Sequence, residues 1–329
     1  DPYVGNPPRA AAKDTDLSAL QAEGAGFIVL GGYEDSQTYV PVFDGTNETG
    51  SHITWNKSSW EYSPINYWLE GKTYKFVAYA PAKLQEGDLF DIDYTGNKLK
   101  MKDGRTFTAD GETDLVVAEG KPQGYPVAAE PVQMETVGFK FYHALSKVKF
   151  TFINGWRNAV TLKITNIKLS NVKNTGSLTT SGTMAQGSDK IQLSAWSGQT
   201  GTADYEDKAD GMNTDEYEAS YEFENFLLPT VLNDSQMKLT FTVQMTNSQG
   251  TGPDLGAGAG NPVNKEVVIP KDVVTEWMPG YAYNYKLTIS GSTFGLKPIQ
   301  FDDIDVDSEW GNGGEDDIEN GEIKVVPGA

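Results

Sequence analysis

Alternation of apolar and polar residues is the feature of this sequence that most constrains its fold. Residues 238–245 read KLTFTVQM, in which every second residue is apolar. Similar alternation runs through residues 145–153 and 283–290. Successive side chains of a β-strand point to opposite faces, so each segment is predicted to be an antiparallel strand with one face toward a core and the other toward water.

Helical periodicity is weak throughout the chain. The best helical segment, residues 271–277, is two turns long at most, and no longer segment places apolar residues at i, i+3, i+4 and i+7. Parallel α/β folds need crossover helices, so the sequence predicts an all-β protein built of antiparallel β-sandwiches. Residues 162–164 and 167–169 alternate out of phase by one residue, which predicts a β-bulge near Thr165 and Asn166.

The length of 329 residues predicts two domains of ordinary size. Between residues 120 and 134, prolines and glycines interrupt the strand pattern. We therefore expect an N-terminal β-sandwich with an extended arm in residues 1–130. A C-terminal β-sandwich with an acidic, glycine-rich tail is expected in residues 131–329.

Composition excludes several classes of function. The net charge of −20 repels phosphate backbones, so nucleic acid is not an expected partner. The absence of cysteine excludes disulfides, thiolate catalysis and cysteine–zinc sites. The only histidines are His52 and His143, no Gly-x-Ser-x-Gly elbow is present, and the acidic run 302–309 lacks the glycine and glutamate of an EF-hand loop. We expect a protein that is not an enzyme and needs no cofactor or metal.

A group of aromatic residues early in the chain leaves two interpretations open. Trp55, Trp60 and Trp68, with Tyr62 and Tyr67, could stack on a sugar. The same residues also suit the core or the edge of a sandwich. Binding of a glycan through Trp55, Trp60 and Trp68 is therefore one hypothesis for function.

Several motifs, taken in chain order, resemble the fimbrillin-like family of pilus subunits from anaerobic Gram-negative bacteria. They are WEYSP at 60–64, YW at 67–68, GKTYKFVAYAP at 71–81, HALSKV at 143–148, FLLP at 226–229 and WMPGYAYNY at 277–285. The resemblance implies two transthyretin-like antiparallel β-sandwich domains in tandem. It also implies a structural subunit, whether shaft, tip or anchor, of a cell-surface fimbria that supports adhesion.

The resemblance further implies how such a subunit is exported and assembled. It would be exported as an outer-membrane lipoprotein precursor, which an arginine-specific protease would then cut. It would then join other copies or related pilus subunits by donor-strand exchange, in which a strand of one subunit completes the sheet of the next. A host protein or glycan would be the ligand for adhesion.

The chain ends are the residues on which this mechanism would depend. Arg9-Ala10, in a proline-rich arm, best matches the family's cleavage site, although an ordinary chain terminus has the same composition. The candidate donor strand is Ile323, Lys324, Val325 and Val326, with residues 311–321 as its tether. Pairing of this tail with its own domain is the alternative.

Two other functions compete with the fimbrial one. A glycan-binding outer-membrane surface lipoprotein would use the aromatic group at residues 55–68. A secreted hydrolase would need a defined pair of catalytic acids, which spacing cannot identify in so acidic a chain.

Overall fold

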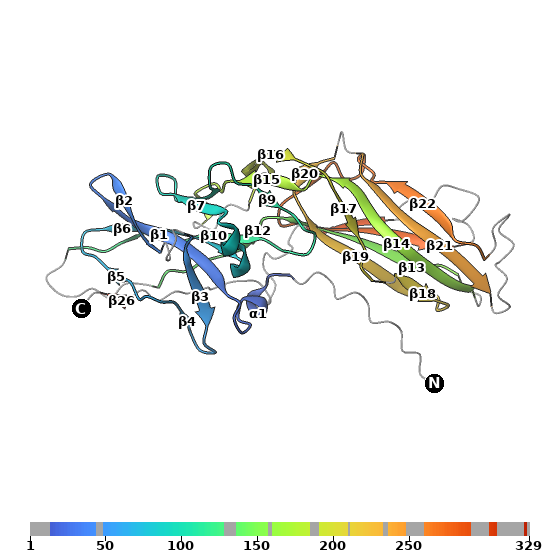
Figure 1. Ribbon diagram of the computed structural model, residues 1–329, viewed down its shortest axis with the longest axis horizontal. Helices are drawn as coiled ribbons and strands as arrows, with labels where there is room; N and C mark the ends of the chain where they lie inside the picture. The colour runs from blue at the N-terminus through green and yellow to red at the C-terminus, as the bar shows by residue number, and fades with distance from the viewer. Residues whose placement is uncertain are drawn as a thin grey trace.

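The computed structural model describes residues 14–43, 49–127, 136–156, 160–184, 191–209, 211–232, 236–247, 260–290, 303–307 and 326–327. Figure 1 shows an elongated molecule, with the first half of the chain at one end and the second half at the other. In these residues helix is confined to short pieces: α1 (Leu17–Leu20), η2 (Ala82–Gly87) and η4 (Leu193–Ala195). None of the helices in the described residues is long and apolar enough to cross a membrane.

The first half is built on one large antiparallel sheet. Its main path is β12 (Tyr142–His143), β10 (Val116–Glu119), β6 (Thr73–Ala80), β1 (Phe27–Asp35), β3 (Ser51–Trp55) and β4 (Trp60–Glu61). β2 (Thr38–Phe43) pairs with β1, and β11 (Gln123–Gly124) pairs with β6.

Both faces of this sheet are covered, which explains its uninterrupted apolar runs. In β1, Phe27 and Val29 belong to one buried cluster, whereas Ile28 and Leu30 belong to another. Strands that are buried on both faces lose the polar half of the alternation.

Short strands cover one face of the large sheet. β7 (Phe90–Asp93) and β8 (Lys98–Met101) form a hairpin over it. β9 (Phe107–Thr108) joins β15 (Thr175–Leu178) and β16 (Trp196–Thr200) in a three-stranded sheet. The buried cluster on this face therefore includes residues from both halves, among them Leu178 and Trp196.

The second half is a sandwich of two sheets around a single buried cluster. One sheet orders β19 (Ser220–Leu227), β13 (Ser146–Asn154), β24 (Ala282–Ile289) and β25 (Asp303–Asp307). The other orders β17 (Ala203–Glu206), β14 (Val160–Val172), β21 (Lys238–Asn247) and β22 (Val263–Val268), with β18 (Met212–Thr214) beside β14. β13 and β24 are parallel, whereas the other pairs in these two sheets are antiparallel.

Two small pairs complete the fold. β20 (Thr230–Val231) pairs with β23 (Glu276–Trp277) in the second half. β5 (Tyr67–Trp68) pairs with β26 (Val326–Pro327), so that residues from near the C-terminus lie against the first half (Figure 1).

The predicted all-β class and the predicted bulge are confirmed. The register of β14 against β21 shifts between Thr165 and Lys168, and Asn166 has a φ of 53°. The helix considered for residues 271–277 does not form, because these residues make a turn followed by β23. The boundary between residues 130 and 131 and the transthyretin-like character of the two sandwiches stay predictions.

Candidate functional site

The first described residues of the chain are held at the junction of the two halves. The backbone N–H of Thr15 donates to Asp114 Oδ2 at 2.8 Å, and the Thr15 hydroxyl donates to the backbone oxygen of Asp114 at 2.9 Å. Asp16 then caps α1 by accepting from the backbone N–H of Ala19. Leu20, at the end of that turn, is buried in the first half. We call residues 14–20 the strap.

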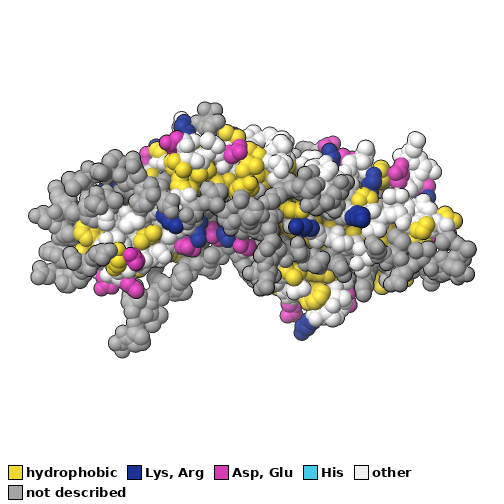
Figure 2. All heavy atoms as spheres, turned by 180° about the vertical axis from the view of Figure 1, so that it is seen from behind, with side chains coloured by type: hydrophobic (Ala, Val, Ile, Leu, Met, Phe, Trp, Pro, Cys, Tyr) yellow, Lys and Arg dark blue, Asp and Glu magenta, His cyan; other side chains and the backbone are white. Residues whose placement is uncertain are grey.

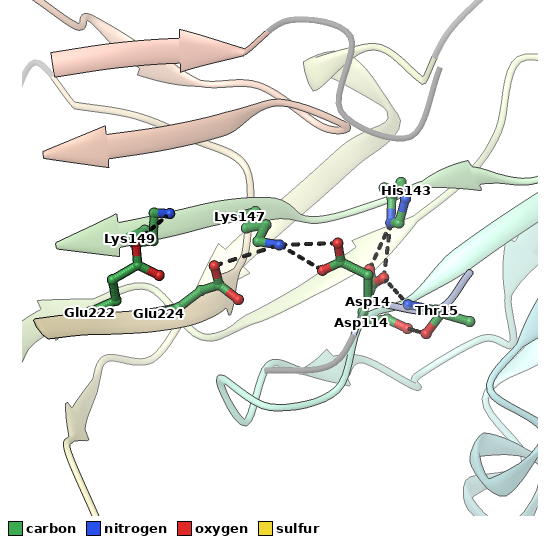
Figure 3. A network of polar contacts seen from close by, with 8 residues as sticks. All are labelled: Asp14, Thr15, Asp114, His143, Lys147, Lys149, Glu222 and Glu224. Carbon is green, nitrogen blue, oxygen red and sulfur yellow. Dashed lines mark hydrogen bonds and ion pairs between the residues drawn. The ribbon is translucent and has the colours of Figure 1, made fainter. Parts of the chain in front are cut away.

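A buried ion pair lies beneath the strap. The Asp114 carboxylate is fully buried and lies 2.9 Å from Nδ1 of His143, whose side chain is 6% exposed. Burial lowers the pKa of His143, but the charge and hydrogen bond of Asp114 outweigh it, so the pKa lies above the ordinary value of 6.5. Asp114 thus accepts from both the strap and the imidazole (Figure 3).

A second ionic contact ties the strap to the other half. Lys147 Nζ on β13 lies 2.8 and 3.0 Å from the two carboxylate oxygens of Asp14. It also lies 3.5 Å from Glu224 Oε2 on β19. Burial raises the pKa of Glu224, and Lys147 only partly offsets that effect. The next pair along these strands, Lys149 and Glu222, extends the row of charges along the sheet of the second half (Figure 3).

The other chain end lies elsewhere, on β5. Val326 pairs with Tyr67 and Pro327 with Trp68, in a parallel arrangement. Of the four candidate donor residues, only Val326 is among the described ones. Ile323, Lys324 and Val325 lie outside them, as do Arg9 and Ala10.

Around β5 the surface is unusually apolar. The exposed fractions are 57% for Ile65, 51% for Tyr67, 45% for Leu69 and 77% for Val127. Val127 lies beside Gly71, where an added Cβ would come within 3.2 Å of its side chain. We call these four residues the β5 patch. Clusters of exposed apolar side chains commonly mark surfaces that contact another chain or segment.

The first half also has a hollow of about 410 Å³ between β2 and the β7–β8 hairpin. Its lining includes the buried apolar residues Leu30, Phe43 and Ile92. Lys100 and Lys102 also line it. Asp91 and Asp103 line it too, and the two lysines pair with acidic residues, Lys100 with Asp91 and Lys102 with Asp88. The hollow thus combines apolar residues with paired charges.

The tryptophans of the glycan hypothesis do not form one exposed platform. Trp60 and Trp68 are buried, and Trp55 is half-buried against Trp60 at a ring distance of 5.2 Å. Trp60 packs edge-on against Phe27. Sugar binding by these residues stays a prediction.

Charged side chains elsewhere are dispersed. On the face shown in Figure 2, described lysine and arginine side chains lie among acidic and uncharged ones, and hydrophobic side chains appear in small groups. No group of three or more His, Asp or Glu side chains in the described part of the chain could hold a metal ion. The candidate functional site is therefore made of the described residues nearest the two chain ends, the strap and β26, with the residues that hold them.

Comparison with known proteins identifies the family of this chain. A family model described as fimbrillin-like matches residues 26–301. The chain belongs to the fimbrillin-like family. No curated protein matches it.

Solved structures similar to this fimbrillin-like chain include a fimbrial protein from Bacteroides vulgatus. That structure is 15% identical, with a TM-score of 0.46, and the alignment covers 88% of this chain and 93% of the other. Another is the fimbrial anchor protein Mfa2 from Porphyromonas gingivalis. It is 10% identical, with a TM-score of 0.34 and coverage of 86% and 88%.

Sequence reasoning missed the residues that hold the strap of this family member. Asp14 and Thr15 lie just outside the predicted strands, and Asp114 precedes a buried apolar run. Nothing in local periodicity links residues 99 positions apart. The one usable signal was His143 at the start of a strong strand, where a buried histidine usually has a hydrogen-bond partner.

Proposed function

We propose that this chain is a structural subunit, whether shaft, tip or anchor, of a cell-surface fimbria that supports adhesion. Membership of the fimbrillin-like family over residues 26–301 supports this role. We further propose that the subunit is exported as an outer-membrane lipoprotein precursor and cut at Arg9-Ala10 by an arginine-specific protease. Its partners are other copies or related pilus subunits, and a host protein or glycan is the ligand.

The mode of assembly that we propose is donor-strand exchange by the C-terminal residues. The observation that carries it is the pairing of β26 with β5. β25 ends at Asp307 in the sheet of the second half, whereas β26 lies on the first half. Residues 308–325 connect them, and a connection of this length spans up to about 60 Å when extended. A segment that reaches its own first half could equally reach the first half of a neighbouring subunit.

The first half offers features that a donated strand needs. The β5 patch provides exposed apolar side chains beside a strand that pairs with few residues. The hollow between β2 and the β7–β8 hairpin has apolar residues in its lining that could take alternate side chains of a donated strand. In an extended donor, Ile323 and Val325 would share one face.

The test is a truncation that removes residues 319–329. We expect a folded monomer, judged by circular dichroism, that forms no fibres on cells viewed by electron microscopy. A matched pair of variants sharpens the test. Ile323→Ser with Val325→Ser should abolish fibres, whereas Lys324→Gln, on the opposite face, should leave them intact. Normal fibres from the truncated chain would refute strand donation by this end.

Processing at the other end has its own test. Arg9→Ala should leave the arm uncut in cells that contain the arginine-specific protease, as read by mass spectrometry of the surface protein. Lys13→Ala, four residues on, is the control and should be cut normally. Cutting of the Arg9→Ala chain at its usual position would refute this assignment.

A further inference from the structure

The strap is held by two different kinds of contact. Its Thr15 is bonded to Asp114, which precedes β10 in the first half, and its Asp14 is paired with Lys147 on β13. Leu20 anchors the far end of the strap in the apolar core of the first half. The strap therefore links the two halves of the molecule where they meet (Figure 3).

The Asp114 carboxylate depends on the groups that surround it. Its side chain is fully buried, and a buried carboxylate is stable only when cations or N–H and O–H donors compensate it. The imidazole of His143, at 2.9 Å, supplies one donor and, when protonated, a positive charge. The backbone N–H of Thr15 supplies another donor.

We propose that the strap is a protonation-controlled clasp, closed while His143 carries a proton and loosened when His143 loses it. When the imidazolium charge is lost, the buried Asp114 carboxylate is stabilised by contact with water instead. Water reaches the carboxylate most directly by displacing Thr15, the residue of the strap that covers it. The proposal rests on these contacts alone and does not depend on fibre assembly.

The direction of the pH effect follows from the surroundings of His143. Burial and the Lys147 ammonium on β13 both disfavour its charge. Asp114 beside β10 and Asp14 on the strap favour the charged imidazolium. Their effect outweighs that of burial and Lys147, so the pKa of His143 is raised. A raised pKa means that the stabilisation is fully present below the unfolded value near 6.5 and is lost as the pH rises through the folded value. Glu224, on the far side of Lys147, moderates the repulsion from that lysine.

The size of the effect is limited because neutral His143 still donates one hydrogen bond to Asp114. What is lost is the difference between a charge-assisted and a neutral hydrogen bond. That difference corresponds to about a fivefold increase in the open population of the strap.

The chain has two histidines, so one can be tested and the other can serve as the control. Hydrogen–deuterium exchange of the full chain would be followed at pH 6 and pH 8.5 in peptides covering residues 14–26. Protection factors, corrected for the pH dependence of intrinsic exchange, are compared in the wild type, His143→Gln and His52→Gln. His52 is the matched control because it contacts the backbone oxygen of Ala25, next to the strap, yet is exposed.

We expect protection to fall about fivefold between the two pH values in the wild type and in His52→Gln. In His143→Gln, protection should be low and equal at both pH values. Persistence of the fall in His143→Gln would assign it to another group and would overturn the proposal. So would equal protection at both pH values in the wild type.

A second measurement keeps the test decisive if His143→Gln does not fold. Titration of the His143 imidazole of the wild type by NMR should give a pKa above the ordinary value of 6.5. A pKa of His143 below that ordinary value would overturn the proposal without any variant.

Discussion

Glu119 provides the sharpest test of how the two halves are joined. This residue ends β10 in the first half and is almost fully buried. Its carboxylate accepts the hydroxyl of Thr180 and the backbone N–H groups of Gly182, at 2.7 Å, and Met184, at 2.8 Å. One side chain thereby fixes a loop from the second half of the chain against the large sheet.

The change Glu119→Ala removes all three acceptor contacts. A hydrogen bond to a charged group contributes about 1.5–3 kcal/mol, and a buried N–H left without an acceptor carries a similar penalty. These terms overlap, and removing a buried charge offsets part of the loss. We expect the free energy of unfolding to fall by about 3–4 kcal/mol, a large part of the usual 5–15 kcal/mol.

Glu119→Gln separates the hydrogen bonds from the charge. Its amide oxygen can keep the contacts with Thr180 and Gly182, but its NH₂ group then faces the N–H of Met184. The expected loss is about 1–3 kcal/mol, smaller than for the alanine variant.

Urea unfolding, followed by tryptophan fluorescence and circular dichroism, measures both variants. Trp196 is a useful probe because it lies in the same buried cluster as Met184. Glu206→Ala is the control, since that side chain is 71% exposed and should change stability by less than about 0.5 kcal/mol. A loss below about 1 kcal/mol for Glu119→Ala would refute the reasoning.

Two further predictions concern the strap and the turn that follows it. Lys147→Met should lower stability by about 1–2 kcal/mol at pH 7, because it removes the cation that lies 3.5 Å from the buried Glu224 carboxylate. Since burial raises the pKa of that carboxyl, the loss should shrink as the pH falls below its folded value, and thermal melts at pH 5 and pH 7 test this sign. Gly26→Ala should lower stability by more than about 3 kcal/mol, because φ is 100° and the added Cβ would lie 2.0 Å from the backbone oxygen of Ile53. Gly104→Ala, with φ of 74° and nothing within 4 Å, should cost about 1 kcal/mol in the same assay.

Local pattern was sufficient for the strands that face water on one side. β21 and β24 follow the alternation of their sequences, with inward residues such as Phe241 and Tyr285 buried. The bulge in β14 was also predictable, because one extra residue shifts the phase of the pattern. These features depend only on neighbours along the chain.

Features that depend on distant partners were not predictable from the sequence. Residues 271–277 have helical spacing, yet Trp277 is buried in a strand that pairs with β20. β15 pairs with β9, far earlier in the chain, and the register of such a pair depends on the packed cores. The Asp114–Thr15 contact also joins residues far apart in the chain, so local pattern could not predict it.

The described residues nearest the two chain ends differ in how firmly they are held, and this difference bears on the strand exchange that we propose. Residues 14–20 are fixed by hydrogen bonds to a buried carboxylate, an ion pair and the burial of Leu20. In the part of the chain that the structure describes, β26 is held by a two-residue parallel pairing with β5. Backbone pairing of that length contributes little by itself, since each hydrogen bond adds only about 1 kcal/mol against the entropy of ordering the chain. In the exchange proposed above, β26 is therefore the described segment that would leave its own subunit at the lower cost, whereas the strap would stay bound.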